Sequence, residues 1–141
     1  MPLLQRSVPF RASRDATVTD AELSITGTMI GSPDYLSPEQ VIGAPVTYAS
    51  DIYSLGVMLF EMMTGRLPFR ATSVLAAASK RLIENPPLPR VLVPELSAQW
   101  QSVILRCLAR RPEARFPDAL AVFRALCGEP AREGPGAGCK V

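Results

Sequence analysis

The pattern of hydrophobic residues changes sharply near residue 50. Residues 1–31 have neither helical nor strand periodicity, and their mixture of Ser, Thr, Asp and Arg is typical of loops. Residues 51–64 are apolar on nearly every face, which predicts a helix that is buried all round. We expect Ser50 to cap this helix and Gly65 to end it. Gly56 lies inside it at a cost of about 1 kcal/mol relative to alanine, which favours a close approach of another backbone.

Three further amphipathic segments follow, and each has a polar residue suited to cap a helix. The first begins after Thr72 or Ser73 and stops before Pro86, the second begins after Ser97, and the third begins after Asp118. The expected inward faces are Val74, Leu75, Ala78 and Leu82 in the first helix, Trp100, Val103, Ile104, Cys107 and Leu108 in the second, and Leu120, Phe123, Leu126 and Cys127 in the third. The fold class is therefore predicted to be mainly α, with no strand.

Composition excludes several classes of function. The chain of 141 residues has 15 basic and 13 acidic residues and a formal net charge of +2. This charge produces too weak a positive field to hold a nucleic-acid backbone. It has no histidine, which excludes Ser-His-Asp and Cys-His triads and histidine-metal sites. We therefore expect no metal site built on histidine and no nucleic-acid partner.

Cysteine usage and hydropathy bear on the compartment. The three cysteines, Cys107, Cys127 and Cys139, form no CxxC pair, so neither a zinc site nor a disulfide framework is indicated. The N-terminus lacks the apolar run of a signal peptide, and the apolar stretch 52–63 is shorter than the roughly 20 residues of a membrane span. These observations favour the cytoplasm and no membrane association.

Three blocks of sequence resemble one known family. They are Gly31-Ser-Pro-Asp-Tyr-Leu-Ser-Pro-Glu39, the stretch 51–69 that ends in Gly-Arg-Leu-Pro-Phe, and residues 107–119. In order and spacing they are similar to the end of the activation segment, the central buried helix and the stretch between the last two helices of eukaryotic-type, bacterial-like serine/threonine protein kinases. The resemblance covers residues 17–127. It implies part of the helical C-terminal lobe, with the N-terminal lobe absent and residues 1–16 unassigned. Residues 128–141 are rich in Gly, Pro and Ala, which predicts a flexible tail.

The first block resembles a substrate-binding segment. Ser32 matches the hydroxyl residue that shapes the pocket around the substrate's Ser or Thr, and Gly31 lets the backbone turn beneath it. The local alternative is a Gly-Ser-Pro turn, because these residues suit turns by themselves.

The same block ends at Glu39, a glutamate that also has a counterpart in the family. Ser37, Pro38 and Glu39 match the family's Ala-Pro-Glu, with serine in place of alanine, and Arg115 matches the distant arginine that pairs with this glutamate. A guanidinium suits such a role because its planar fork holds a carboxylate bidentately. The alternative is that Arg115, close to Arg110 and Arg111, is one more solvated charge.

Other positions carry weaker implications of the resemblance. Asp51 matches an aspartate that accepts backbone N–H groups of the catalytic loop in the family, although an acid in the first turn of any helix is favoured by the helix dipole. Gly56 belongs to the same matched helix. Thr26 and Thr28 lie where the family carries activating phosphorylation, without an identified arginine partner for the phosphate. Trp100 and the methionines Met58, Met62 and Met63 are expected to be core packing.

The parts that perform phosphoryl transfer are not identifiable. The reaction requires a Gly-rich loop, a strand lysine, a base aspartate with an asparagine for metal, and an Asp-Phe-Gly aspartate for Mg²⁺. The only lysines are Lys80, in a predicted helix, and Lys140, in the predicted tail, and the sole asparagine, Asn85, is expected at a helix end. Arg14-Asp15 is preceded by serine, not histidine. We therefore assign no catalytic or metal residue and expect no cofactor here, although ATP and Mg²⁺ serve the complete family.

Two functional hypotheses remain open. The first is an incomplete serine/threonine kinase domain whose family activity is ATP-dependent phosphorylation of protein Ser or Thr, and which is inactive as this chain alone. The second is a non-catalytic interaction module that binds a kinase or a protein substrate. In both cases the apolar helix 52–63 would expose a large patch, from which we expect self-association.

Overall fold

The computed structural model describes residues 32–128, and the expectations for Gly31, Thr26, Thr28 and the residues beyond 128 lie outside this range. Eight helical elements follow one another in the described part, and it contains no strand. They are η2 (Pro33–Tyr35), α1 (Pro38–Val41), α2 (Tyr48–Thr64), α3 (Val74–Ile83), α4 (Pro89–Leu92), α5 (Ala98–Cys107), η3 (Pro112–Ala114) and α6 (Ala119–Cys127). The mainly α prediction is confirmed.

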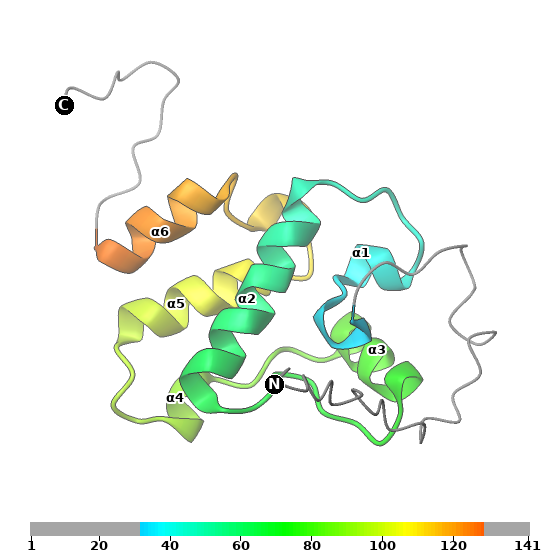
Figure 1. Cartoon of the computed structure of the whole chain (residues 1–141), viewed down its shortest axis with the longest axis horizontal. Coiled ribbons are helices and arrows are strands. Elements are labelled where there is room, and N and C mark those ends of the chain that lie inside the picture. The colour runs from blue at the N-terminus through cyan, green and yellow to red at the C-terminus, as the bar shows by residue number, and fades with distance from the viewer. Residues whose placement is uncertain (1–31, 129–141) are drawn as a thin grey trace, which may run out of the picture.

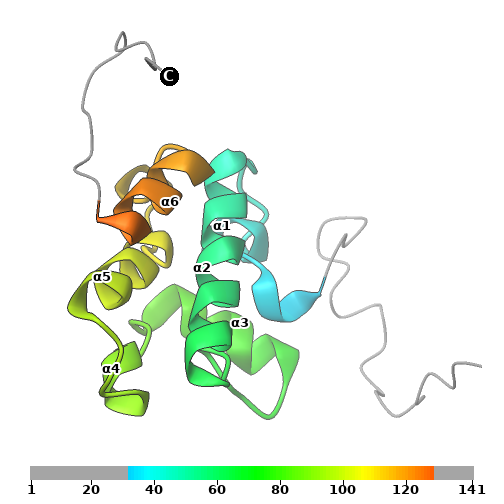
Figure 2. The same cartoon turned by 60° about the vertical axis from the view of Figure 1, so that its left-hand side comes forward.

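Helix α2 is the centre of the arrangement. It crosses in front of α5 in Figure 1, with α4, α5 and α6 on one side and α1 and α3 on the other. Figure 2, turned by 60°, shows the same two groups on either side of α2. None of the helices in residues 32–128 is long and apolar enough to cross a membrane.

The core lies along the side of α2 that faces α5 and α6. One cluster joins Tyr53, Val57 and Phe60 of α2 to Ile104 and Leu108 at the end of α5. The other cluster is made of residues from α2, α5, the segment after η3 and α6: Ile52, Val103, Cys107, Phe116 and Val122. The apolar run of α2 therefore packs on two neighbours at once.

The ends of α2 confirm one prediction and correct another. Gly65 ends the helix with φ +71°, a left-handed conformation that glycine adopts without strain. The N-cap is Thr47, whose side chain accepts from the N–H of Ala49 at 3.2 Å. The expectation that Ser50 caps the helix is wrong, because Ser50 lies in its first turn and its hydroxyl donates to Glu39.

The starts of the later helices were predicted well. Ser73, Ser97 and Asp118 each cap the following helix by accepting from a backbone N–H at the third residue after the cap. The predicted inward face of α5 is also confirmed, with Val103, Ile104, Cys107 and Leu108 buried and Trp100 half-buried. Short helix α4 was missed, since it is a single turn that begins at a proline within a proline-punctuated stretch.

The inward faces of α3 and α6 were predicted less well. In α6, three of the four expected inward residues are exposed, namely Leu120, Phe123 and Cys127, with 61% of the Phe123 surface open. Leu126 packs on the core as expected, and Val122 is buried instead of the others. In α3, Leu75 is exposed while Arg81 is buried. Both helices are apolar on more than one side, so periodicity does not decide which side of α3 meets η2 and α1, or which side of α6 meets α2 and α5.

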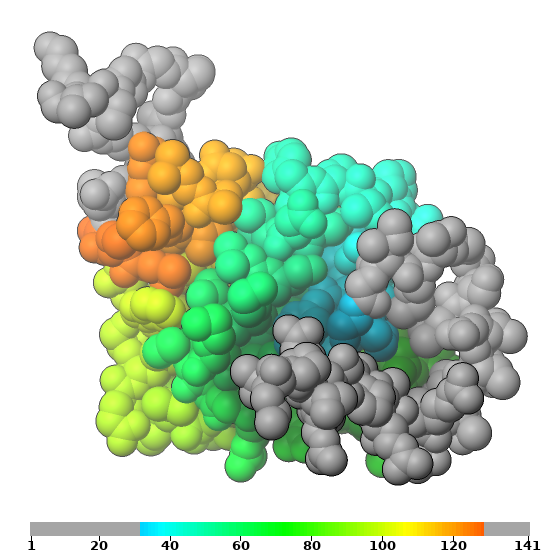
Figure 3. Space-filling model, in the orientation of Figure 1, coloured from blue at the N-terminus to red at the C-terminus, as the bar shows by residue number. Residues whose placement is uncertain are grey.

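Helix α2 is not buried all round, contrary to the prediction. Met58 is half-exposed and Met62 has 72% of its surface exposed, so neither is core packing, while Met63 packs against the core. Figure 3 shows α2 at the surface of the molecule between α6 and the segment around α1. Within residues 32–128, no element covers this face of α2.

Candidate functional site

The segment before α2 is shaped by a capping box. The Ser37 hydroxyl accepts from the backbone N–H of Gln40 at 3.4 Å, and the Gln40 side chain accepts from the backbone N–H of Ser37 at 2.9 Å. Pro38 stands at the first helical position, where its missing N–H is not needed. Glu39, in the first turn of α1, is thereby directed into the protein and is buried.

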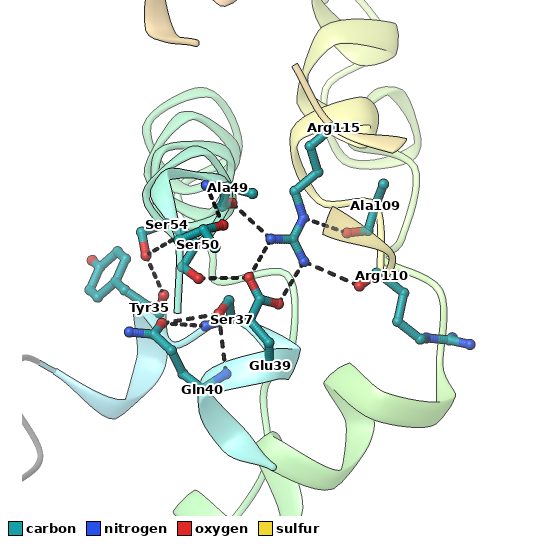
Figure 4. A network of polar contacts seen from close by, with 11 residues as sticks. Tyr35, Ser37, Glu39, Gln40, Ala49, Ser50, Ser54, Ala109, Arg110 and Arg115 are labelled. Atoms are coloured by element: carbon teal, nitrogen blue, oxygen red, sulfur yellow. Dashed lines mark hydrogen bonds and ion pairs between the residues drawn. The ribbon is translucent and has the colours of Figure 1, made fainter. Parts of the chain in front are cut away.

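Glu39 forms a bidentate ion pair with Arg115, which is 76 residues further along the chain. Nη1 donates to Oε1 at 2.6 Å and Nη2 donates to Oε2 at 2.9 Å (Figure 4). The Arg115 side chain is 0% exposed and the Glu39 side chain 8%. The expected contact between these two residues is therefore present, and the alternative of a solvated arginine is excluded.

The remaining donors of Arg115 are also satisfied. Nη1 donates to the Ala49 carbonyl at 2.7 Å, Nε to the Ala109 carbonyl at 2.8 Å, and Nη2 to the Arg110 carbonyl at 3.1 Å (Figure 4). With the two bonds to Glu39, all five N–H groups of the guanidinium have an acceptor. The guanidinium carbon also lies 4.9 Å from the centre of the Tyr53 ring. One side chain thus joins α1, the start of α2 and the segment after α5.

The surroundings of Glu39 keep it ionised. Burial taken alone raises its pKa, but hydrogen bonds from Arg115, from the Ser50 hydroxyl at 2.7 Å and from the backbone, together with the Arg115 charge, lower the pKa to about 2. A carboxylate this acidic and this fully engaged does not exchange protons near neutral pH. The pair therefore holds the structure in place, and does not serve as an acid or base.

The segment in front of α1 is held on α2 and α3. The Ser54 hydroxyl donates to the Tyr35 carbonyl at 2.7 Å, and the Tyr35 hydroxyl donates to Glu61. From α3, Arg81 donates to the Asp34 carbonyl. Ser32 is exposed at the start of η2, and its side chain forms no capping hydrogen bond there. The result is a fixed backbone that presents the Ser32 hydroxyl at the surface.

Comparison with known proteins now identifies the class of this helical unit. A family model described as the protein kinase domain matches residues 12–124. The chain belongs to the protein kinase family. The matched range contains the whole Glu39–Arg115 network, so the ion pair lies within the family's own domain.

The curated relatives are bacterial serine/threonine kinases. The chain is 44% identical over 97 residues to the serine/threonine-protein kinase PksC of Streptomyces coelicolor, covering 69% of this chain and 17% of that protein. It is 39% identical over 111 residues to the serine/threonine-protein kinase Pkn1 of Myxococcus xanthus, covering 77% and 16%. For PknA of Corynebacterium glutamicum the identity is 42% over 111 residues, covering 76% and 23%. The chain thus spans less than a quarter of the length of these relatives.

Two other positions that the kinase resemblance singled out, Asp51 and Gly56, lie outside the Glu39–Arg115 network. Asp51 is exposed in the first turn of α2, where the helix dipole favours an acid, and does not join the ion-pair network. A close approach at Gly56 was expected from another backbone; the neighbours found are side-chain atoms of Cys107 and Leu108, and a Cβ at Gly56 would lie 2.6 Å from the Cβ of Cys107. No group of three or more acidic, histidine or cysteine side chains in residues 32–128 could hold a metal ion.

Three residues that hold the kinase segment were missed by sequence reasoning. Tyr35 belongs to the segment in front of α1 and ties it to α2, because its hydroxyl donates to Glu61. Ser54 and Arg81 hold the same segment from α2 and α3, through bonds to the carbonyls of Tyr35 and Asp34. Ser54 follows Ser50 by one helical turn, so a polar stripe on an otherwise apolar helix was a usable signal. Arg81 offered no such signal, because an arginine in an amphipathic helix is usually solvated.

Proposed function

We propose that the chain is part of a serine/threonine protein kinase whose complete form transfers the γ-phosphate of ATP to protein hydroxyls. Its described residues would anchor the segment along which the protein substrate binds. The observation that carries this proposal is the buried Glu39–Arg115 pair, which fixes α1 against the core between two blocks of the matched family.

Ser32 is proposed to contribute to the pocket for the substrate's Ser or Thr, together with Gly31. Support comes from its exposed position on a backbone that α2 and α3 hold. Thr26 and Thr28 remain candidates for phosphorylation on the basis of the resemblance alone. Asp51, Ser37 and Pro38 are proposed as structural members of the family's motifs.

We propose further that this chain alone does not transfer phosphate. The described residues 32–128 do not fit ATP and Mg²⁺: no group of three or more acidic, histidine or cysteine side chains there could hold the metal, Glu39 is engaged by Arg115, and Lys80 donates to the Arg70 carbonyl. The sequence also has no histidine for a His-Arg-Asp loop. Phosphoryl transfer requires groups that neutralise the charge of the phosphates. Without them, positioning a substrate hydroxyl does not accelerate the reaction.

The test is an assay of the purified 141-residue chain with radiolabelled ATP, Mg²⁺ and a Ser/Thr-rich peptide. We expect no incorporation above the blank, with a complete bacterial serine/threonine kinase as the positive control. Incorporation that follows the chain through purification would overturn the proposed inactivity.

The alternative function is a non-catalytic module that binds a protein substrate or a kinase. It is favoured by one observation, namely that contacts within residues 32–128 suffice to hold the segment around Tyr35. A fluorescent array of Ser/Thr peptides distinguishes the two. Saturable binding that weakens in Ser54→Ala but not in Ser79→Ala, an exposed hydroxyl on α3, supports the module. Equal binding by both variants removes that support.

We place the chain in the cytoplasm. Both cysteines in the described part, Cys107 and Cys127, are free thiols, as in reducing compartments. Burial raises the pKa of Cys107 to about 12, so this thiol remains protonated and unreactive.

A further inference from the structure

A pocket of about 270 Å³ opens between the end of α3 and the end of α5. Its walls include apolar side chains from three parts of the chain, among them Phe69, Leu105 and Leu108. Two arginines, Arg81 and Arg110, also line it. A closed apolar cavity of about 150 Å³ accommodates a benzene molecule. This pocket therefore has room for a small ring and a polar group attached to it.

Arg81 is the unusual member of this wall. Only 3% of its surface is exposed, and of its three guanidinium nitrogens only Nη2 has an acceptor, the Asp34 carbonyl. Nε and Nη1 are buried without a hydrogen-bond partner in the part of the chain that the structure describes. Leaving charged donors unmatched in this way is costly, which is why buried arginines are nearly always paired.

The contrast with Arg115 sharpens this point. Arg115 is equally buried, yet every one of its N–H groups has an acceptor, including a carboxylate. Among residues 32–128, no carboxylate pairs with Arg81, and Asp34 offers it only a backbone carbonyl. Burial also lowers the pKa of Arg81, which reflects the unfavourable desolvation of its charge. An anion entering the pocket would supply what Glu39 supplies to Arg115.

The charges around the pocket also favour an anion. Arg110 lines it and donates to the Glu84 carbonyl at 3.2 Å, and Asn85 adds an amide. Glu84 is the one acid in the lining, against two arginines. The pocket therefore carries an excess of positive charge beside an apolar wall.

We propose that this pocket binds a small organic anion, in which an apolar body of about the size of a benzene ring carries one carboxylate or phosphate group. The anionic group pairs with the Arg81 guanidinium, whose buried Nε and Nη1 turn toward the pocket to meet it, and the body packs on Phe69, Leu105 and Leu108. This site is separate from the Glu39–Arg115 network and does not depend on the proposed function.

The test is a titration of the isotope-labelled full chain, followed by amide chemical shifts, at constant ionic strength. The probes are benzoate and phenyl phosphate, and benzyl alcohol is the neutral control of the same size. We expect both anions to cause saturable shifts at the ends of α3 and α5, at concentrations at least tenfold lower than benzyl alcohol requires. The anion that saturates first identifies the preferred group.

Three variants tie the binding to the pocket. Arg81→Met should weaken benzoate binding at least tenfold and leave benzyl alcohol unchanged, since a guanidinium–carboxylate pair is lost. Ala109→Leu, which fills the lining without altering Arg81, should weaken both ligands. Arg111→Gln is the matched control, because this arginine is exposed and lies outside the lining, and it should change neither.

The proposal is overturned if benzoate behaves like benzyl alcohol, if its shifts do not saturate, or if Arg81→Met binds it as well as the parent chain. In each of these cases the pocket holds water only. Should Arg81→Met fail to fold, as judged by circular dichroism, Ala109→Leu decides: undiminished benzoate binding in that variant is enough to reject the site.

Discussion

At the scale of single residues, Arg115 shows how one side chain can fix three segments. Its planar fork meets the Glu39 carboxylate, the Ala49 carbonyl at the start of α2, and the carbonyls of Ala109 and Arg110 after α5. Every N–H donor of Arg115 has an acceptor, and these hydrogen bonds offset the cost of desolvating its charge. A lysine could not reproduce this planar geometry. The same geometry makes the residue sensitive to truncation.

We expect Arg115→Ala to lower the free energy of unfolding by about 3 to 5 kcal/mol, because it leaves the Glu39 carboxylate buried without its partner. Urea denaturation followed by circular dichroism measures this change. The control is Arg111→Ala, whose side chain is 79% exposed and pairs with Glu113 at the surface. It should change the stability by no more than about 0.5 kcal/mol. Equal midpoints for the two variants would contradict the structural role of the pair.

Glu39 also predicts a dependence of stability on acid. Its pKa is about 2 in the folded chain and near 4.5 when unfolded, so the unfolded state binds the proton first as the pH falls. The stabilisation is complete above pH 4.5 and is lost progressively between pH 4.5 and 2. Chemical denaturation over this range should therefore show falling stability. Glu39→Gln should be less stable at pH 6 and should fall less steeply, and a parallel curve would argue against the assignment.

The sequence predicted the pairing of Glu39 with Arg115 but not the burial of Arg81, for a physical reason. The first two lie in blocks whose order and spacing carry a family resemblance, which pairs residues that local patterns cannot relate. Arg81 lies in an amphipathic helix with no such block around it. Its burial depends on how α3 packs against η2 and α1, which is a tertiary property.

At the scale of elements, α2 and α5 cross closely at Gly56. We expect Gly56→Ala to destabilise the chain by about 1 to 3 kcal/mol through overpacking, because the new Cβ would lie 2.6 Å from the Cβ of Cys107. The overpacking outweighs the gain of about 1 kcal/mol in helix propensity, so the net effect is destabilising. Thermal and urea denaturation of the variant provide the measurement.

A double-mutant cycle with Cys107→Gly isolates this contact. Removing the Cβ atom of Cys107 should reduce the penalty of Gly56→Ala, whatever Cys107→Gly costs by itself. If Gly56→Ala instead stabilises the parent chain, the two helices have room to spare at this crossing and the close approach is refuted.

Helix starts were predictable to within a few residues, whereas helix faces were not. The start of a helix is determined locally by a side chain that accepts a backbone N–H, as with Ser97 and Asp118. The face that becomes buried depends on the partner. In α6 the chain offers Leu120 and Phe123 on one side and Val122 on another, and contact with α2 and α5 selects Val122.

At the scale of the whole molecule, apolar surface remains exposed on the central helix. A helix that is apolar on nearly every face requires neighbours all round, and α4, α5, α6 and η2 cover only part of α2. Met58 and Met62 lie one turn apart on the remaining face, which residues 32–128 leave open. Large open apolar patches are rare on stable monomers and usually mark an interface.

We therefore expect the purified chain to self-associate through this face of α2. Sedimentation velocity over a concentration series should show the mean sedimentation coefficient rising with concentration, and Met58→Lys combined with Met62→Lys should shift the distribution toward the monomer. The control is Leu75→Lys, an equally exposed apolar residue on α3, which should leave association unchanged. A parent chain that remains monomeric throughout would contradict the prediction, and so would equal effects of the α2 and α3 variants. All these variants add positive charge at exposed apolar positions. The comparison therefore distinguishes association through the Met58 and Met62 face of α2 from association through exposed apolar surface in general.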